Sequence, residues 1–303
     1  MNKLRAELLT KIEGISLGEG PCWDPRSSSF LFVDIMDSSI FELADDGSVL
    51  NRFRTPSHVG AVLPAKSDDW LIVLQDGFYV LSRSGDVAPL LQIEHGSSIR
   101  FNDAKCDANG RAFAGTMSYT FDRGAGSLYR LDPPLVASKI LTDLTISNGI
   151  GWSPDNKTMY FIDSATQCVV AMPYDIDSGS IGTGRELVRF TDREGMPDGL
   201  CVDADGGVWV ALLMGSEIRR ITPRGEADIS IELPVRRPTS CAFGGQRGNQ
   251  LLITTSSFAI DECEREEAPL SGALFSIELN VTAPPASLWD LSAVATTVEN
   301  EKL

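Results

Sequence analysis

Short apolar runs separated by polar turns recur along almost the whole chain. Each copy of the pattern has an apolar strand, a turn rich in Asp, Asn, Gly or Pro, and a second apolar strand. The second strands show the pattern most clearly and are expected at 30–34, 70–74, 112–116, 159–163, 208–212 and 250–254. Third strands are expected at 39–43, 127–131 and 217–221. Asp107-Ala-Asn-Gly110 and Asp203-Ala-Asp-Gly206 are typical of hairpin turns.

The copies follow one another at intervals of 39 to 50 residues, through the equivalent positions Trp23, Val62, Asp107, Ser153, Asp203 and Gly244. Repeats of this length indicate arrays or propellers. No amphipathic helix of ten residues or more is evident. The pattern therefore predicts an all-β fold, a six-bladed β-propeller that forms a single domain over residues 1–303. Tails at about 1–12 and 284–303 are less regular, and one of them is expected to close the ring by adding a strand to the last blade.

Four polar segments stand at equivalent places, each at the head of an apolar strand. They are Gly18-Glu19-Gly20-Pro21, Arg100-Phe101-Asn102-Asp103, Ser147-Asn148-Gly149 and Pro197-Asp198-Gly199. Equivalent places in a circular repeat converge on one axis, so two carboxylates and two amide oxygens are expected to meet there. Such oxygen ligands suit a hard cation, Ca²⁺ above all. The sequence therefore predicts a central metal site.

Taken singly, each of these residues also has a simpler interpretation. Glu19 could be a solvated turn carboxylate, Asn148 a turn former or cap, and Asp198 an Asx-turn residue. Their coincidence at equivalent positions favours the metal site. No paired His or Cys residues support a structural zinc site.

Charge and composition narrow the class of ligand. The chain has 42 acidic and 26 basic residues and a net charge of −16. Such a surface repels nucleic acid, anionic lipid and polyanionic substrates, so a small neutral ligand or a cation is expected. No secretory signal and no apolar stretch of about 20 residues is evident, so we expect a cytoplasmic protein without membrane contact. No protein partner is predicted. The six cysteines lack ligand spacing and are expected to be free thiols packed among strands.

Two further features bear on chemistry. Arg100, beside Asn102, could hold ligand oxygens or a developing oxyanion, or could simply pair with a nearby carboxylate. Gly14-Ile-Ser16-Leu-Gly18 resembles a hydrolase nucleophile elbow, but no helix can follow it and only His58 and His95 could serve as a base. We therefore do not expect Ser16 to be a nucleophile. His58 precedes the second blade. It could line the mouth of the site, or it could simply be a hydrogen-bonded histidine of a turn.

Seven segments resemble the gluconolactonase, regucalcin and luciferin-regenerating-enzyme family. They lie at 17–24, 100–103, 114–117, 126–129, 146–149, 196–199 and 239–245 and run in the family's order over nearly all of the chain. The resemblance implies a six-bladed propeller with one divalent cation in the central channel, Ca²⁺ first, with Zn²⁺, Mn²⁺ or Fe²⁺ as alternatives. It implies metal ligation by Glu19, Asn148 and Asp198.

The same resemblance implies a metal-dependent lactonase that opens a sugar (aldono-) lactone, with Asp198 as the base and Arg100 and Asn102 on the substrate. Diisopropylfluorophosphatase, more distant in fold, has a metal ligand placed like Asn102, so Asn102 could be a metal ligand or a substrate contact. Some family members carry a sugar-contacting glutamate after Gly-Thr-Met, which the stretch 117–121 lacks. Two alternatives remain open: a non-catalytic calcium-binding propeller, and a phosphotriesterase-like hydrolase that uses the same metal.

Overall fold

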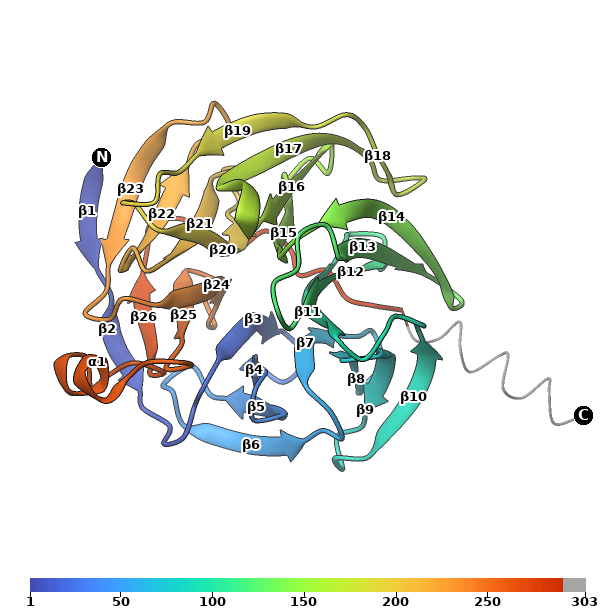
Figure 1. Cartoon of the computed structure of the whole chain (residues 1–303), viewed down its shortest axis with the longest axis horizontal. Coiled ribbons are helices and arrows are strands. Elements are labelled where there is room, and N and C mark those ends of the chain that lie inside the picture. The colour runs from blue at the N-terminus through green and yellow to red at the C-terminus, as the bar shows by residue number, and fades with distance from the viewer. Residues whose placement is uncertain (291–303) are drawn as a thin grey trace, which may run out of the picture.

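The computed structural model describes residues 1–290, which form six small, mainly antiparallel sheets around a common axis (Figure 1). The predicted all-β, six-bladed propeller is confirmed. Within these residues the α-helix α1 (Glu262–Glu267) is a single short element, in agreement with the absence of long amphipathic helices from the sequence. No helix in this part of the chain is long and apolar enough to cross a bilayer. The remainder of the C-terminal tail, from residue 291, lies outside the described residues.

Each blade runs from an inner strand at the axis to an outer strand at the rim. The inner strands are β3 (Gly18–Asp24), β7 (Val59–Pro64), β11 (Ile99–Cys106), β15 (Ser147–Trp152), β20 (Met196–Val202) and β24 (Pro238–Gly244). The second strands are β4 (Ser29–Asp34), β8 (Trp70–Leu74), β12 (Ala112–Ser118), β16 (Thr158–Asp163), β21 (Val208–Leu213) and β25 (Gln250–Thr255). The third strands are β5 (Ser39–Leu43), β9 (Gly77–Leu81), β13 (Gly126–Asp132), β17 (Cys168–Asp175), β22 (Glu217–Ile221) and β26 (Leu274–Glu278).

The outer strands are β6 (Val49–Arg54), β10 (Val87–Gln92), β14 (Val136–Leu144), β19 (Arg185–Arg189), β23 (Ala227–Glu232) and, in the sixth blade, β2 (Glu7–Thr10). β18 (Ser180–Ile181) extends the β17 hairpin, and the short 3-10 helix η1 (Ser164–Thr166) follows β16. The outer strand β6 is largely exposed, whereas β4 and β8 are buried along their whole length. Strands packed on both faces tolerate continuous apolar runs, which explains why the second strands gave the clearest repeat.

The hydrophobic core is divided among the interfaces between blades. One buried cluster fills each of the six interfaces between neighbouring blades. Between the first and sixth blades, for example, Phe30 and Phe32 pack against Leu252 and Leu274. Each blade is therefore held by its two neighbours, and the inner strands stand in a closed ring around the axis.

The N-terminal segment closes this ring. β2 pairs antiparallel with β26 and so becomes the outer strand of the last blade, as the sequence predicts for one of the tails. β1 (Asn2–Arg5) pairs parallel with β23 in the fifth blade, a strand that the sequence did not predict. The two strands thus cover the outer edges of β23 and β26 in adjacent blades.

The C-terminal segment forms a strap across the end of the propeller where the inner strands finish. The backbone N–H of Ala204, after β20, donates to Thr282 O, and Trp289 exchanges backbone hydrogen bonds with Pro64 and Lys66, after β7. The Trp289 side chain is fully buried in the cluster between the second and third blades. In Figure 1 the strap passes behind the inner strands, so the opposite end of the channel faces the viewer.

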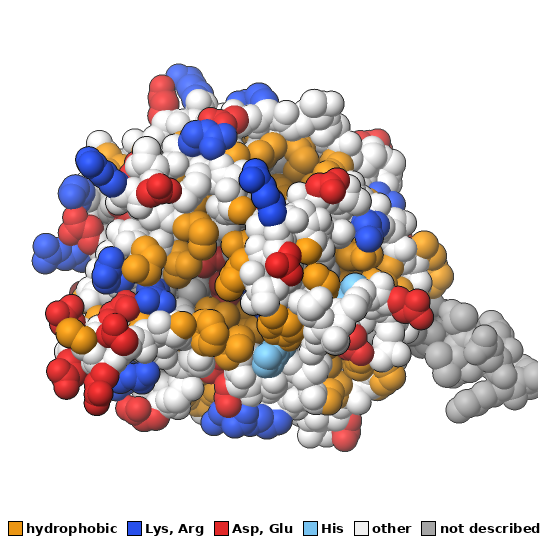
Figure 2. Space-filling view, in the orientation of Figure 1, with side chains coloured by type: hydrophobic (Ala, Val, Ile, Leu, Met, Phe, Trp, Pro, Cys, Tyr) orange, Lys and Arg blue, Asp and Glu red, His pale blue; other side chains and the backbone are white. Residues whose placement is uncertain are grey.

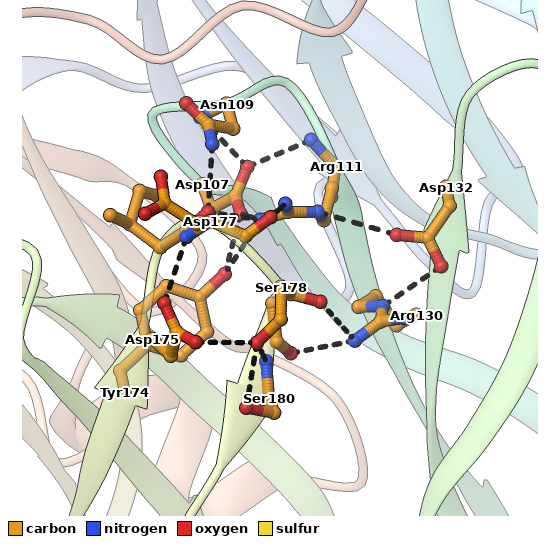
Figure 3. A network of polar contacts seen from close by, with 12 residues as sticks. Asp107, Asn109, Arg111, Arg130, Asp132, Tyr174, Asp175, Asp177, Ser178 and Ser180 are labelled. Atoms are coloured by element: carbon orange, nitrogen blue, oxygen red, sulfur yellow. Dashed lines mark hydrogen bonds and ion pairs between the residues drawn. The ribbon is translucent and has the colours of Figure 1, made fainter.

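Buried aspartates at the strap end lock the turns that follow the inner strands. Asp107 accepts hydrogen bonds from the backbone N–H groups of Asn109 and Arg111 and from the side chains of Arg111 and Tyr174 (Figure 3). Arg111 also donates to Ile176 O, which ties the third blade to the fourth. Buried Asp24 and Asp203 accept similar side-chain and turn contacts in the first and fifth blades. This end of the propeller is therefore rigidly crosslinked.

Candidate metal and substrate site

The polar residues predicted to meet at the axis lie in β-bulges of the inner strands. Strand register shifts between Glu19 and Cys22, Phe101 and Ala104, Ser147 and Ile150, and Pro197 and Leu200. β7 and β24 have shifts at the corresponding place. A bulge re-aims a side chain while the strand continues. The sequence placed these residues ahead of the inner strands, and this is wrong by one to three residues, because each strand begins before its bulge.

Glycines let the inner strands approach one another at the level of the bulges. A Cβ on Gly149 would lie 2.8 Å from Asp198 O and 2.9 Å from Leu200 N. A Cβ on Gly60 would lie 2.5 Å from Asn102 O. Because backbone cannot yield to such contacts, a side chain at either position would push two inner strands apart. The close packing of β15 on β20 and of β7 on β11 therefore requires these glycines.

Asn148 and Asp198 meet directly across the interface between the fourth and fifth blades. Asn148 Nδ2 donates to Asp198 Oδ1 and, at 3.1 Å, to Ser164 Oγ. Both side chains are buried. The Asn148 side-chain oxygen is also buried and accepts no hydrogen bond. A buried amide oxygen without a partner is costly, and such an atom suits a ligand that the protein itself does not supply.

Arg100 and Asn102 form a second pair in the third blade. Arg100 Nη1 donates to Asn102 Oδ1 at 2.6 Å and to Phe101 O at 3.0 Å. Asn102 Nδ2 donates to Ser147 O at 3.0 Å, which links β11 to β15. Both side chains are buried. Asn102 therefore holds the guanidinium of Arg100 in place and bridges to the strand that carries Asn148.

The charges at the axis strongly influence one another. Burial raises the pKa of Glu19 well above its usual range, and the carboxylates of Asp198 and Asp103 add to this shift. Burial also raises the pKa of Asp198 to about 8, with Asp103 adding to the effect and Asn148 and Arg100 opposing it. Because these residues come from the first, third and fifth blades, their mutual effects show that they share the centre of the ring. A dication placed among them would favour the ionised form of each carboxylate.

Glu19, Asn148 and Asp198 fit a hard cation by their donor chemistry. The buried carboxylates of Glu19 and Asp198 are not fully balanced by positive charges or hydrogen bonds. Asn148, which contacts Asp198, has a side-chain oxygen that accepts no hydrogen bond. Over residues 1–290 no cluster of three or more His, Cys, Asp or Glu side chains could hold a metal ion. A metal site formed by Glu19, Asn148 and Asp198 therefore needs the amide oxygen of Asn148, which is an ordinary ligand for Ca²⁺.

The second strands hold the loops that lead into two of these bulges. Asp163, at the end of β16, accepts hydrogen bonds from the backbone N–H groups of Thr145 at 3.0 Å and Ile146 at 2.9 Å. Asp34, at the end of β4, accepts them from Ser16 and Leu17 at 2.8 and 3.0 Å. Both aspartates stand at the same place in the sequence repeat, which could have indicated this role.

Sequence reasoning missed three residues near the site. Asp103 follows Asn102 in the bulge of β11, is buried and acts electrostatically on both Glu19 and Asp198. Its position inside the Arg100–Asp103 segment was a usable signal. Tyr119 lies beside Arg100, with the guanidinium carbon 5.8 Å from its ring centroid. Lys105 donates to Leu200 O and opposes the rise in the pKa of Asp103 that burial causes.

Figure 2 shows the face that the site opens onto. Hydrophobic side chains surround a hollow near the middle of this face, and acidic side chains lie within it.

A separate cavity of about 470 Å³ lies off the axis, lined among others by Lys11, Ser16, Phe258 and Arg265. It includes none of the predicted site residues. His58 and His95 contact Tyr119 and Phe101 rather than Ser16, in agreement with the dismissal of a nucleophile elbow.

The thiols agree only in part with expectation. All six are free, and five of them lie on strands. Cys263 is exposed on α1, so the expectation that every thiol packs among strands is wrong for this residue. Its helix belongs to the long loop between β25 and β26, where no sheet neighbour covers it. Cys201 Sγ and Cys241 Sγ lie 3.6 Å apart on neighbouring inner strands.

Known proteins show the same fold and sequence pattern. A family model described as "SMP-30/Gluconolactonase/LRE-like region" matches residues 17–257. A Bacillus subtilis protein named "Putative sugar lactone lactonase YvrE" is 36% identical over 87% of this chain and 91% of its own. Regucalcin of Gallus gallus is 35% identical over 86% of this chain and 90% of its own.

A solved structure of regucalcin from Agrobacterium tumefaciens, described as a calcium-binding protein, superimposes with a TM-score of 0.89. That match covers 95% of this chain and 98% of the other at 26% identity. The family resemblance in the sequence is thus confirmed over most of the molecule. The chain belongs to the SMP-30/gluconolactonase/LRE-like family of six-bladed propellers.

Proposed function

We propose that the protein is a metal-dependent lactonase that hydrolyses a sugar lactone at the axis of the propeller. The observation that carries this proposal is the buried set Glu19, Asn148 and Asp198, with two carboxylates of raised pKa and one amide oxygen without a partner. Membership of a family that includes a lactonase-named relative supports the same reaction.

The residues favour Ca²⁺ as the cation, because the donor set is made of oxygens and contains no thiolate or imidazole. Glu19 and Asp198 would supply two negative charges to balance it. Zn²⁺, Mn²⁺ and Fe²⁺ are the alternatives. When bound, such a cation polarises a carbonyl oxygen and lowers the pKa of a nearby water molecule.

Asp198 is the proposed general base. Its contact with Asn148 fixes one carboxylate oxygen, so the other oxygen is available to accept a proton from water as that water attacks the lactone carbonyl carbon. The bond between the carbonyl carbon and the ring oxygen then breaks, and Asp198 returns the proton to the departing ring oxygen, which becomes a hydroxyl group. Ring opening yields a hydroxy acid, and no covalent enzyme intermediate is needed.

Arg100 and Asn102 are the proposed substrate contacts. Arg100 is buried and remains charged, and Asn102 holds one of its nitrogens at 2.6 Å. A guanidinium fixed in this way can bind ring hydroxyl groups or stabilise the oxyanion without reorganisation. Asn102 also orients Arg100, and one Nδ2 hydrogen and one Oδ1 lone pair of its amide remain for a ring hydroxyl group.

A pH-indicator assay tests this function directly. Purified protein is incubated with a panel of aldonolactones and with an organophosphate triester, before and after chelator treatment. We expect lactone hydrolysis that the chelator abolishes and Ca²⁺ restores. Hydrolysis of the triester alone would instead support the phosphotriesterase-like alternative.

A non-catalytic calcium-binding propeller is the second candidate. It is favoured by the similarity to a regucalcin described as a calcium-binding protein. It would use Glu19, Asn148 and Asp198 but would need no buried Arg100. Calcium binding without hydrolysis of any substrate in the panel would support this candidate and contradict the lactonase.

A further inference from the structure

Two aromatic side chains from neighbouring blades form a polar pair beside Arg100. Tyr119 follows β12 in the third blade, and His58 precedes β7 in the second. His58 Nδ1 and the Tyr119 hydroxyl oxygen lie 2.7 Å apart, and the rings meet edge to face at 5.5 Å. Both residues are partly exposed on the face where the site opens. We call His58 and Tyr119 the aromatic pair.

Arg100 connects this pair to the carboxylates at the axis. Its guanidinium carbon lies 5.8 Å from the Tyr119 ring centroid. The same guanidinium interacts electrostatically with Glu19 and Asp198. A small ligand whose carbonyl lies at Asp198 and whose substituents extend past Arg100 would therefore reach the aromatic pair.

The chemistry of the pair suits hydroxyl groups. Burial and the charge of Arg100 lower the pKa of His58, and burial raises that of Tyr119, so both are neutral at pH 7. Either partner can donate the shared hydrogen bond, because the imidazole has two tautomers and the phenol can donate or accept. Whichever donates, the pair keeps one free donor and one free acceptor. A hydroxyl group complements both, whereas an alkyl chain would leave them desolvated and unpaired.

We propose that His58 and Tyr119 are specificity-determining residues that recognise the hydroxyl-bearing part of an uncharged, polyhydroxylated lactone. The inference rests on the proposed lactonase function and adds to it the part of the substrate that this chain selects. An anionic substituent is disfavoured because the chain as a whole carries a net charge of −16.

The test compares two lactones of the same ring size. Glucono-δ-lactone carries hydroxyl groups, and δ-valerolactone carries none. We expect Tyr119→Phe to lower kcat/KM for the first about tenfold and to change it less than twofold for the second. His58→Leu should act in the same direction, and the double variant should lose less than the product of the two single effects.

Tyr79→Phe is the matched control, since it removes a phenol from the second blade that contacts Asp76 rather than Arg100. This variant should leave kcat/KM unchanged for both lactones. If Tyr119→Phe lowers kcat/KM equally for both lactones, Tyr119 has a merely structural role. If it lowers kcat/KM for neither, Tyr119 does not contact the substrate. Each of these two results would overturn the proposal.

A binding measurement separates this proposal from the lactonase itself. An open-chain hexitol, which cannot be hydrolysed, should raise the melting temperature of the Ca²⁺-supplied wild type and should raise it less in Tyr119→Phe. If the wild type hydrolyses neither lactone, the proposed function fails, and the hexitol shift still decides whether the aromatic pair binds hydroxyl groups. An equal shift in wild type and Tyr119→Phe would contradict the pair's role.

Discussion

Asp198 has two roles at the residue scale, since it would both ligate the cation and accept the proton of the attacking water. We therefore expect Asp198→Asn to lower kcat for a sugar lactone by roughly a thousandfold or more. The measurement is steady-state hydrolysis with saturating Ca²⁺. Asp205→Asn removes an exposed carboxylate from the turn after the same strand and should be silent. Turnover by Asp198→Asn close to that of wild type would rule out the mechanism.

The raised pKa of Asp198 also gives the metal-free protein a characteristic response to pH. The carboxyl group has a pKa near 4 in an unfolded chain and about 8 in the folded protein, so the folded state binds its proton more tightly. This contribution to stability is complete below about pH 4 and is lost as pH rises through about 8. Glu19, whose pKa is also raised, acts in the same direction.

We therefore expect the melting temperature of chelator-treated protein to fall between pH 5 and pH 9, with Ca²⁺ restoring most of the loss at the higher pH. Asp198→Asn should show a shallower fall, because only Glu19 and Asp103 then contribute from the axis. Differential scanning calorimetry in buffers of matched ionic strength provides the comparison. The same slope in both proteins would mean that Asp198 does not titrate in this range.

At the scale of elements, the bulges depend on loops that second-strand aspartates hold. Asp163 accepts two backbone hydrogen bonds from the loop ahead of Asn148. Its replacement by Ala should leave both N–H groups unpaired and lower the free energy of unfolding by about 1–3 kcal/mol. It should also weaken Ca²⁺ binding, because Asn148 loses its fixed position.

Calorimetric titration of Ca²⁺ and urea denaturation together check this prediction. Asp155→Ala is the control, since Asp155 accepts hydrogen bonds in an exposed turn at the other end of the same blade. If Asp163→Ala loses stability but binds Ca²⁺ as wild type does, the bulge is positioned by something other than this loop.

Much of the architecture could be predicted from the sequence, because the repeat arises from local residue patterns. The second strands, the Asp-x-x-Gly turns and the six-fold repeat all depend on residues close together in the chain. Glu19, Asn148 and Asp198 could be predicted as a set because they occupy equivalent places in that repeat.

The remainder depends on contacts between blades that no local pattern encodes. The bulges were missed because register is set by pairing with the next strand. The aromatic pair was missed because His58 and Tyr119 come from different blades and only the closed ring brings them together. β1 was missed because its four residues, three of them exposed, carry no clear alternation, and only the edge of β23 makes them a strand.

For the molecule as a whole, the C-terminal strap fastens the end of the ring opposite the site. Trp289 is fully buried between the second and third blades, and Lys66 pairs with Asp290 at 3.0 Å. Trp289→Ala should lower the free energy of unfolding by about 3–5 kcal/mol, as expected when a large buried side chain leaves a cavity.

Urea denaturation measures this loss, and Phe258→Ala, which truncates an aromatic side chain that is 40% exposed, should change stability by less than about 0.5 kcal/mol. The Ca²⁺ affinity of the folded Trp289→Ala protein should be close to that of wild type, because the strap lies at the far end of the channel. If Trp289→Ala has the same free energy of unfolding as wild type, β2 alone closes the ring adequately.

The central claim is that a cation binds at the axis through Glu19, and one titration tests it most directly. Melting temperature is followed against Ca²⁺ concentration for chelator-treated wild type and Glu19→Gln, with Zn²⁺ and Mn²⁺ in parallel. A ligand that binds only the folded state adds about 2.7 kcal/mol at a hundredfold excess over Kd. We predict a large rise in wild type and a much smaller one in Glu19→Gln, which lacks one ligand charge. Identical responses of the two proteins to every cation would contradict the assignment.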